Sequence, residues 1–471
     1  MRILLPTGRV TYRMVCDAAK GLDAEVVVTG EIAAFLTPAL LITLVEQGDY
    51  DMVIVSGMST ASFAQVETET GVPVYRGPRH AADLGIVLAR LDHLTLSKEV
   101  PADKWLAGIQ REEAEKRLRA AENAAHFEYR IRGVKIGGGS RIKVLAEVMD
   151  AHRCTDLKPV VESLFDSGAD IVDLGFGFDA TPSDVSLAMK FLEGVEGPLA
   201  IDTQDPDLIR AGLDRADIVA SLHEENIPAI GSEVADAGAC AVVVPHGKSL
   251  EENIAIAEAA GIRVIIADPL LQPAGSGLLP SLSQFRDYGY PLFFGAGNVT
   301  ELLDADSVGA NALLAGLAWE ARAAIIFTSE HSDKCRGSVR EMRRATEMMA
   351  LMEGRRPYPK DLGIDLLVIK EKRRRREPPL EYRQIRAAEP APGEITYDPC
   401  GNFRIGIENG WIVAVIEGRA VRGKSWAEVF AAIQDAGDVS LLDHAAYLGR
   451  ELYKAELAIR FGRSFEQDGD F

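Results

Sequence analysis

The chain has 471 residues, a formal net charge of -20 and five cysteines that lie far apart. This length exceeds one ordinary hydrophobic core, so we expect two or three domains. The acidic balance disfavours nucleic acid as a partner, and the scattered cysteines argue against a disulfide framework or a cysteine-rich zinc site. No signal-peptide pattern opens the sequence and no apolar run is long enough to span a bilayer, so we expect a cytoplasmic protein without a membrane span.

Residues 1–100 have the pattern of a small, open, Rossmann-like α/β domain. Short apolar runs alternate there with helical stretches around Tyr12–Lys20 and Pro38–Gln47, as parallel strands and crossover helices do. The four runs are Arg2–Leu5, Glu25–Val28, Met52–Val55 and Val72–Tyr75. Residues 101–128, rich in Glu, Arg and Ala, are expected to form a charged helical linker.

Residues 129–356 predict a (β/α)8 barrel. A hairpin is expected at Tyr129–Ile136, closing the bottom of the barrel, with Gly137–Gly139 as its exit; the triple glycine is also a weak candidate for a phosphate loop. Eight apolar runs follow, and the segments between them are helical in character, for example Leu157–Ser167, Pro182–Glu193 and Val299–Arg322. The runs are Ile142–Val148, Ile171–Leu174, Leu199–Ile201, Ile218–Ala220, Ala241–Val244, Val264–Ile266, Leu292–Phe294 and Ala324–Phe327.

Three of these runs end in, or are interrupted near their end by, an acidic residue: Asp173, Asp202 and Asp268. Active sites of such barrels lie at the carboxyl ends of the strands. We therefore expect the three carboxylates to surround one concave site. Each aspartate is also compatible with a plainer role, such as capping the helix that follows.

Residues 357–393 are predicted to be a linker, with a basic run at Lys370–Arg376 that is best explained as a solvated helix face. Residues 394–471 predict a small α+β domain. Apolar and polar residues alternate over Ile395–Arg419 around the turn Asn409-Gly410, and helical stretches follow at Ser425–Ala436 and Leu441–Phe461. In the last stretch His444, Tyr447 and Glu451 share one helix face, as a structural cluster or as a ligand or interface site.

Three barrel segments resemble dihydropteroate synthase, the pterin-binding barrel of folate synthesis: GADIVDLG from Gly168, PLAIDT from Pro198 and VIIADP from Val264. The segments Pro291–Gly316 and Ile325–Glu341 are more similar to the dihydropteroate synthase-related proteins of methanogens and methylotrophs. The resemblance covers nearly the whole chain. It implies that Asp202 and Asp268 hold the amino group and ring nitrogens of a pterin, with Asp173 nearby.

Other positions depart from the folate enzyme. Glu147 stands near the position of an asparagine after the first strand, and Asn226 is only a possible substitute for the asparagine after the fourth. The lysine expected after the seventh strand is missing from Gly295-Ala-Gly-Asn298, where Asn298 is a candidate donor. In place of the last-strand Arg-x-His, His331 and Lys334 are candidate catalytic contacts to an anion.

The resemblance implies a transferase that joins a 6-hydroxymethyl-dihydropterin diphosphate to an arylamine, with ribofuranosyl-aminobenzene phosphate as the amine, in tetrahydromethanopterin biosynthesis. Mg²⁺ is a candidate companion of the diphosphate. The alternative is a protein that binds a reduced pterin for one-carbon transfer or as a carrier, which the missing lysine favours. Barrels of this kind often pair, so a homodimer is a further expectation.

Overall fold

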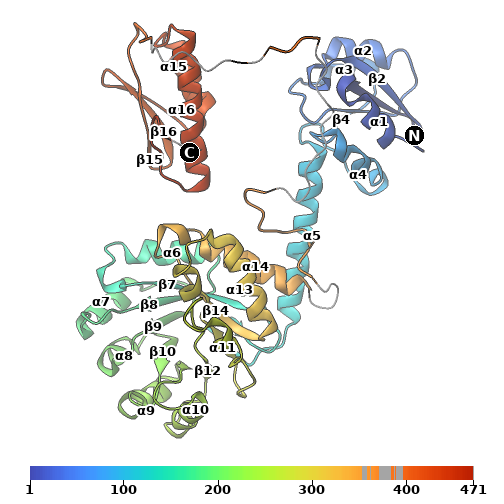
Figure 1. Ribbon diagram of the computed structural model, residues 1–471. Coiled ribbons are helices and arrows are strands. Elements are labelled where there is room, and N and C mark those ends of the chain that lie inside the picture. Colours follow the sequence, from blue (N-terminus) through green and yellow to red (C-terminus); the bar gives the residue numbers. More distant parts are fainter. Residues whose placement is uncertain (353–357, 361, 371–382, 387, 389–395, 470–471) are drawn as a thin grey trace. The chain divides into compact units, whose positions relative to one another are not determined.

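The computed structural model describes residues 1–352, 358–360, 362–370, 383–386, 388 and 396–469. The chain divides into two compact units, Met1–Leu380 and Glu381–Phe471. The first contains an open parallel sheet and a closed barrel, and the second contains a small antiparallel sheet with two helices. The fold class expected from the sequence is confirmed. Figure 1 shows the elements of each part.

The amino-terminal sheet is parallel, with strand order β2-β1-β3-β4. Residues alternate between its two faces, so that Ile3, Leu5 and Ile54 enter one core while Leu4 and Val53 enter the other. Its strands are β1 (Ile3–Gly8), β2 (Ala24–Gly30), β3 (Met52–Val55) and β4 (Val74–Arg76). Its helices are α1 (Tyr12–Ala18), α2 (Pro38–Val45), α3 (Ala64–Thr70) and α4 (Leu84–Leu88).

The predicted helical linker is helix α5 (Ala102–Ala124), and the predicted hairpin follows it as β5 (Tyr129–Ile131) and β6 (Val134–Ile136). Ile131 and Ile136 are buried in the cluster that fills the barrel interior. The hairpin therefore supplies apolar bulk to the inside of the barrel.

The barrel is closed by eight parallel strands in the order β10-β11-β12-β13-β14-β7-β8-β9. They are β7 (Lys143–Val148), β8 (Ile171–Gly175), β9 (Leu199–Asp202), β10 (Ile218–Leu222), β11 (Cys240–Val243), β12 (Ile265–Ala267), β13 (Leu292–Phe294) and β14 (Ala323–Ser329). The helices are α6 (Leu157–Ser167), α7 (Pro182–Phe191), α8 (Pro206–Gly212), α9 (Ile227–Ala237), α10 (Leu250–Ala259), α11 (Leu278–Leu282), α12 (Ala296–Glu301), α13 (Ser307–Glu320) and α14 (Ser338–Met352).

One predicted helix of the barrel is wrong in extent. The stretch Val299–Arg322, expected as one helix, is divided between α12 and α13. The interruption contains Asp304 and Asp306, and aspartate favours turns and helix starts over helix interiors because its carboxylate competes for nearby backbone N–H groups.

An ion-pair network closes the amino end of the barrel. Asp170 accepts hydrogen bonds from Arg141 at 2.5 Å and from Arg343 at 3.0 Å. Lys143, the first residue of β7, is 2% exposed and pairs with Glu122 of α5 at 3.0 Å. Burial lowers the pKa of Lys143 to about 8. A cavity of about 750 Å³ is lined in part by these residues.

The second unit packs two helices on an antiparallel sheet of order β15-β16-β17. Its elements are β15 (Arg404–Glu408), β16 (Trp411–Ile416), β17 (Arg419–Gly423), α15 (Trp426–Asp435) and α16 (Leu442–Phe461). The predicted Asn-Gly turn joins the first two strands, with φ of 49° at Asn409 and 72° at Gly410. Buried residues from the sheet and from both helices form its core.

The three residues predicted to share a face of the last helix have structural partners. His444 Nδ1 lies 3.0 Å from Asp398, the Tyr447 hydroxyl lies 2.8 Å from Gln467 Nε2, and Lys454 donates to the buried Glu451. The predicted basic run, apart from Lys370, lies outside the described residues, as does most of the predicted linker. Among the described residues no helix has the length and apolarity needed to cross a membrane.

Candidate ligand-binding site at the barrel mouth

Four carboxylates lie at the carboxyl end of the barrel because of the two-residue period of its strands. Alternate residues of a barrel strand point inward, and the inward apolar residues include Leu145, Ile171, Ala200 and Ile266. In each of these four segments the residue two positions later is acidic and also points inward. These acidic residues are Glu147, Asp173, Asp202 and Asp268.

The strand register brings these groups together. Glu147 of β7 is the register partner of Asp173 in β8, and Asp202 ends β9. Asp268 directly follows β12, where its Oδ1 accepts a hydrogen bond from the Leu270 N–H at 2.8 Å. Asp173 is 1% exposed, and its buried Oδ1 has no hydrogen-bond partner among the residues that the structure describes. The mouth therefore holds buried acidic groups with unused hydrogen-bonding capacity.

The pKa values of the four acids are all raised. Burial raises the pKa of Asp202 to about 7, with a contribution from the charge of Glu147. Burial likewise raises the pKa of Asp268 to about 7, with a smaller contribution from Asp202. Burial, together with the charges of Asp202 and Glu147, holds the pKa of Asp173 well above its ordinary value. Near neutral pH Asp202 and Asp268 therefore change readily between acceptor-only carboxylates and donor-bearing acids.

A cavity of about 420 Å³ is lined by two of the four carboxylates, and the lining does not include Asp173 or Asp268. Glu147 and Asp202 line it, and the loops after β7 and β8 contribute the exposed apolar side chains Met149 and Phe178. Its volume lies within the range of small-molecule sites. A Cβ on Gly177 would come within 2.6 Å of Asp150 Oδ1, so this loop approaches its neighbour because it carries a glycine.

Glu147 lies near Ser329 and His331. Burial raises its pKa, while a hydrogen bond with Ser329 and the charge of His331 oppose that rise. The exposed His331 follows β14, and its backbone N–H donates to Glu301 at 3.0 Å. Lys334 lies on the same segment but its ammonium group pairs with Asp304 at 2.9 Å. The two predicted anion contacts thus differ, because His331 lies near Glu147 whereas Lys334 pairs with Asp304.

The two asparagines predicted at the site also differ. Asn226 is 3% exposed, and its side chain fixes the loop after β10 by accepting from the His223 N–H at 2.9 Å and donating to the Ser221 carbonyl at 3.0 Å. Asn298 is exposed on the short helix α12, after β13. Asn298 is therefore accessible at the mouth, whereas Asn226 is occupied with backbone.

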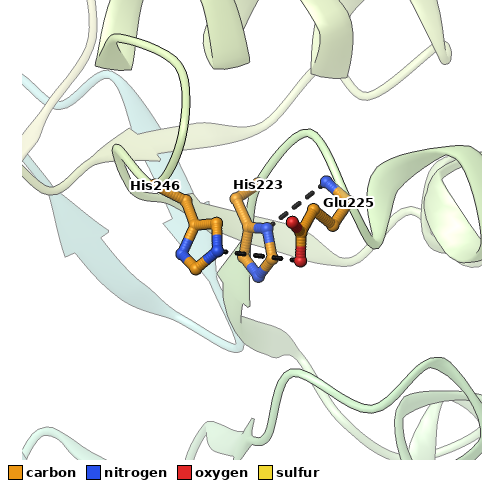
Figure 2. A group of neighbouring side chains, drawn as sticks. All are labelled: His223, Glu225 and His246. Atoms are coloured by element: carbon orange, nitrogen blue, oxygen red, sulfur yellow. Dashed lines mark hydrogen bonds and ion pairs between the residues drawn. The ribbon is translucent and has the colours of Figure 1, made fainter.

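The sequence reasoning missed two histidines at this end of the barrel. His223 directly follows β10 and His246 follows β11, and together with Glu225 they form the cluster drawn in Figure 2. The signal was present, because a polar residue just after a barrel strand lies at the mouth whatever its type. The mouth was predicted from the acidic residues at the strand ends, and the histidines that follow β10 and β11 were not considered.

The donor set of the mouth fits a magnesium ion. Glu147 and Asp150 both line the cavity, and Asp173, the register partner of Glu147, has an oxygen without a hydrogen-bond partner among the described residues. Carboxylate oxygens are the ligands that Mg²⁺ prefers.

Comparison with known proteins finds one relative along the whole chain. Over a 518-residue alignment the chain is 34% identical to "Uncharacterized protein MJ0107" of Methanocaldococcus jannaschii, with 100% of this chain and 99% of that protein covered. Residues 397–468 match the family model PterinBD-DUF4346.

Solved structures of dihydropteroate synthase are also similar in part. The Yersinia pestis enzyme with a pterine-sulfa conjugate is 19% identical, with a TM-score of 0.38, over 47% of this chain and 96% of that chain. The Thermus thermophilus enzyme in complex with 6HMPPP is 18% identical, with a TM-score of 0.35, over 44% of this chain and 93% of that chain.

Proposed function

The chain belongs to the family of the Methanocaldococcus jannaschii protein MJ0107, and from this premise we propose that its barrel binds a pterin at the mouth. Two further observations support the proposal. The family model that matches residues 397–468 is named for a pterin-binding domain. The barrel segments that end in Asp173, Asp202 and Asp268 resemble those of dihydropteroate synthase.

The observation that carries the proposal is the pair of acids formed by the half-buried Asp202 and the buried Asp268, each with a pKa raised to about 7. The edge of a 2-aminopterin presents a row of N–H donors and acceptors. A carboxylate can accept two parallel N–H bonds from such an edge, and a protonated acid can donate one. Acids that titrate near neutral pH are able to adopt either form when the ligand arrives.

We propose that the reaction is the condensation of a 6-hydroxymethyl-dihydropterin diphosphate with an arylamine, with ribofuranosyl-aminobenzene phosphate as the amine in tetrahydromethanopterin biosynthesis. The amine nitrogen forms a bond to the exocyclic methylene carbon while the carbon–oxygen bond to the diphosphate breaks. The nitrogen then releases a proton and pyrophosphate leaves. This chemistry needs no nucleophilic side chain, only positioning and charge stabilisation.

In this proposal Asp202 and Asp268 orient the pterin, and the His331 side chain contacts the departing diphosphate. Glu147 and Asp150 would hold a Mg²⁺ ion that neutralises part of the diphosphate charge. Lys334 takes part only after its ion pair with Asp304 has opened. Asn298 is the accessible donor where the folate enzyme has a lysine.

The test is pyrophosphate release by the purified full-length protein with both substrates and magnesium. Stoichiometric pyrophosphate and a pterin–arylamine product are expected. Absence of both at saturating substrate, in protein that still binds the pterin diphosphate, would exclude the synthase.

A second function is favoured by one observation. The lysine after the seventh strand is missing, and the nearby Lys334 is paired with Asp304. A mouth without that lysine, and with Lys334 already paired, suits a reduced pterin that carries no diphosphate, held for one-carbon transfer or as a carrier. Calorimetry distinguishes the two functions, because this one requires tighter binding of a reduced methylated pterin than of the pterin diphosphate.

A further inference from the structure

A cluster of two histidines and one glutamate lies at the barrel mouth, on different strands from the four acids of the proposed pterin site. His223 and Glu225 are in the loop after β10, and His246 is in the loop after β11. One possible ligand atom from each residue lies within 4.8 Å of the others. Figure 2 shows the three side chains converging from these two loops. They have the residue types of a transition-metal site.

His223 supplies an independent indication of a ligand. The residue is 3% exposed, and within the described part of the chain its buried Nε2 has no hydrogen-bond partner. A buried polar atom without a partner costs about 1–3 kcal/mol, so the fold keeps this nitrogen open at the expense of stability. The other ring nitrogen, Nδ1, accepts only a long bond of 3.3 Å from the Glu225 N–H. Nε2 is therefore the ring atom left for a ligand.

The two loops are tied together by Glu224, which is not itself one of the three residues. Its Oε1 accepts from the backbone N–H groups of Gly247 at 2.6 Å and Lys248 at 3.1 Å, directly after His246. Its Oε2 accepts from Asn253 Nδ2 at 2.8 Å. The backbone that carries His246 is thus fixed against the loop that carries the other two residues.

The side chains within the cluster are close to a coordinating arrangement. His246 Nε2 and Glu225 Oε2 lie 3.6 Å apart. A tetrahedral site with bonds of about 2.0–2.1 Å has edges of about 3.4 Å. The His223 and His246 rings stack with their centroids 4.4 Å apart. The side chains of His246 and Glu225 are 47% and 70% exposed, so small rotations can bring them onto one ion.

We propose that His223, Glu225 and His246 bind one divalent transition-metal ion, with zinc as the ion that two imidazoles and one carboxylate suit best. Coordination through His223 Nε2 moves the ring proton to Nδ1 and gives up the long bond from Glu225. Three protein ligands leave a fourth position open, as in zinc sites that bind water or substrate rather than purely structural ones.

The strand order places this site within the same mouth. In the barrel β10 and β11 lie between β9, which ends at Asp202, and β12, which is followed by Asp268. The open coordination position is therefore on the rim between the two acids. It suits an anionic oxygen, such as that of a phosphate or carboxylate, or a metal-bound water. The metal site does not depend on the identity of the ligand in the proposed pterin site.

The experiment measures zinc binding by the full-length protein, first freed of metal with a chelator. Zinc alone is added, its affinity is measured by competition with a chromophoric chelator, and bound zinc is counted by atomic emission after dialysis. One zinc per chain is expected. The His246→Ala and Glu225→Gln variants change exposed side chains, so the fold is expected to survive. Each should lose more than the roughly 10- to 100-fold in affinity that outer-shell changes cause.

Two histidine variants serve as controls. His126→Ala removes an exposed histidine after α5, and His331→Ala removes the histidine beside Glu147; both should bind zinc as the wild type does. Cobalt in place of zinc should give the intense visible absorption of a tetrahedral ion. No zinc bound by the wild type, or equal affinity in His246→Ala and His126→Ala, would overturn the proposal. Loss of binding in His331→Ala alone would place the ion among the mouth acids instead.

Discussion

The carboxyl groups of Asp202 and Asp268 come from β9 and β12, which are not neighbours in the barrel, yet the charge of Asp202 contributes to the raised pKa of Asp268. The two groups are therefore close enough for the charge of one to act on the other across the mouth. Asp268 is buried and Asp202 is half-buried, and both would be partly protonated at neutral pH in the absence of ligand. When both carboxyl groups are ionised, they lower the free energy of unfolding. Acids with raised pKa values are common at ligand-binding sites.

The first prediction concerns pH and stability. The folded-state pKa of Asp202 is about 7 and its ordinary value is 3.8, so the folded state binds the proton more tightly than the unfolded state. The contribution of Asp202 to the free energy of unfolding is therefore fully present below about pH 4 and is lost as the pH rises through about 7. Asp202→Asn, which cannot ionise, should raise the free energy of unfolding at pH 8 by on the order of a few kcal/mol and leave it nearly unchanged at pH 4.

Differential scanning calorimetry of the ligand-free protein at the two pH values measures this effect. Asp205→Asn is the matched control, because Asp205 is exposed on the same rim and caps α8, a role that asparagine fills equally well. A gain in stability that is the same at pH 4 and pH 8 would contradict the assignment of a raised pKa to Asp202.

The second prediction concerns the ion pair between Lys334 and Asp304. Asp304→Ala should free the Lys334 ammonium group and tighten binding of the pterin diphosphate, while the free energy of unfolding changes by less than about 1 kcal/mol because the pair is exposed. Lys334→Ala alone should change diphosphate affinity little. The measurement is the inhibition of the proposed condensation by inorganic pyrophosphate. Equal inhibition constants for Asp304→Ala and the wild type would show that Lys334 does not reach the anion.

The third prediction concerns the amino end of the barrel. Asp170 accepts from two arginines and from the Val144 N–H at 2.8 Å, and although burial raises its pKa, Arg141 and Arg343 lower it below the ordinary value. Asp170→Asn leaves the buried Arg141 without its ion-pair partner, while Arg343 keeps its pair with Glu347, so a loss of about 3–5 kcal/mol is expected. Because a lowered pKa contributes stability that disappears as the pH falls, the difference from wild type should shrink in acid.

Urea unfolding at pH 7 and pH 3 measures that loss. Asp333→Asn is the control, since its ion pair with Arg336 is exposed and a surface change of this kind stays within about 0.5 kcal/mol. If both variants lost the same stability, the network at the barrel's amino end would have no special role.

The sequence allowed the barrel and its acidic mouth to be predicted because both follow from local pattern. An apolar run buried on both faces identifies a barrel strand, and the two-residue period places Asp173 and Asp202 inward, above Ile171 and Ala200. The division between α12 and α13 was missed, since the stretch is helical in character on both sides of Asp304.

Contacts between distant loops could not be predicted in this way. Glu224 binds the loop after β11 through backbone N–H groups, which no side-chain pattern reveals, and so the meeting of His223 and His246 stayed hidden. The Lys334–Asp304 pair was missed for the same reason, because its partners come from separate segments. Local periodicity in the sequence predicts the strands and helices of the fold. The partners of exposed side chains depend instead on contacts between loops that are distant in sequence.

Direct titration of the full-length protein with a reduced 2-aminopterin, followed by calorimetry at pH 7, tests the central claim most directly. The account predicts saturable binding of one pterin per chain, weakened at least roughly tenfold in Asp202→Asn and in Asp268→Asn by loss of a charge-assisted bond worth about 1.5–3 kcal/mol. Asp205→Asn should bind as the wild type does. Undiminished affinity in both mouth variants, or no binding by the wild type, would contradict a pterin site at the barrel mouth.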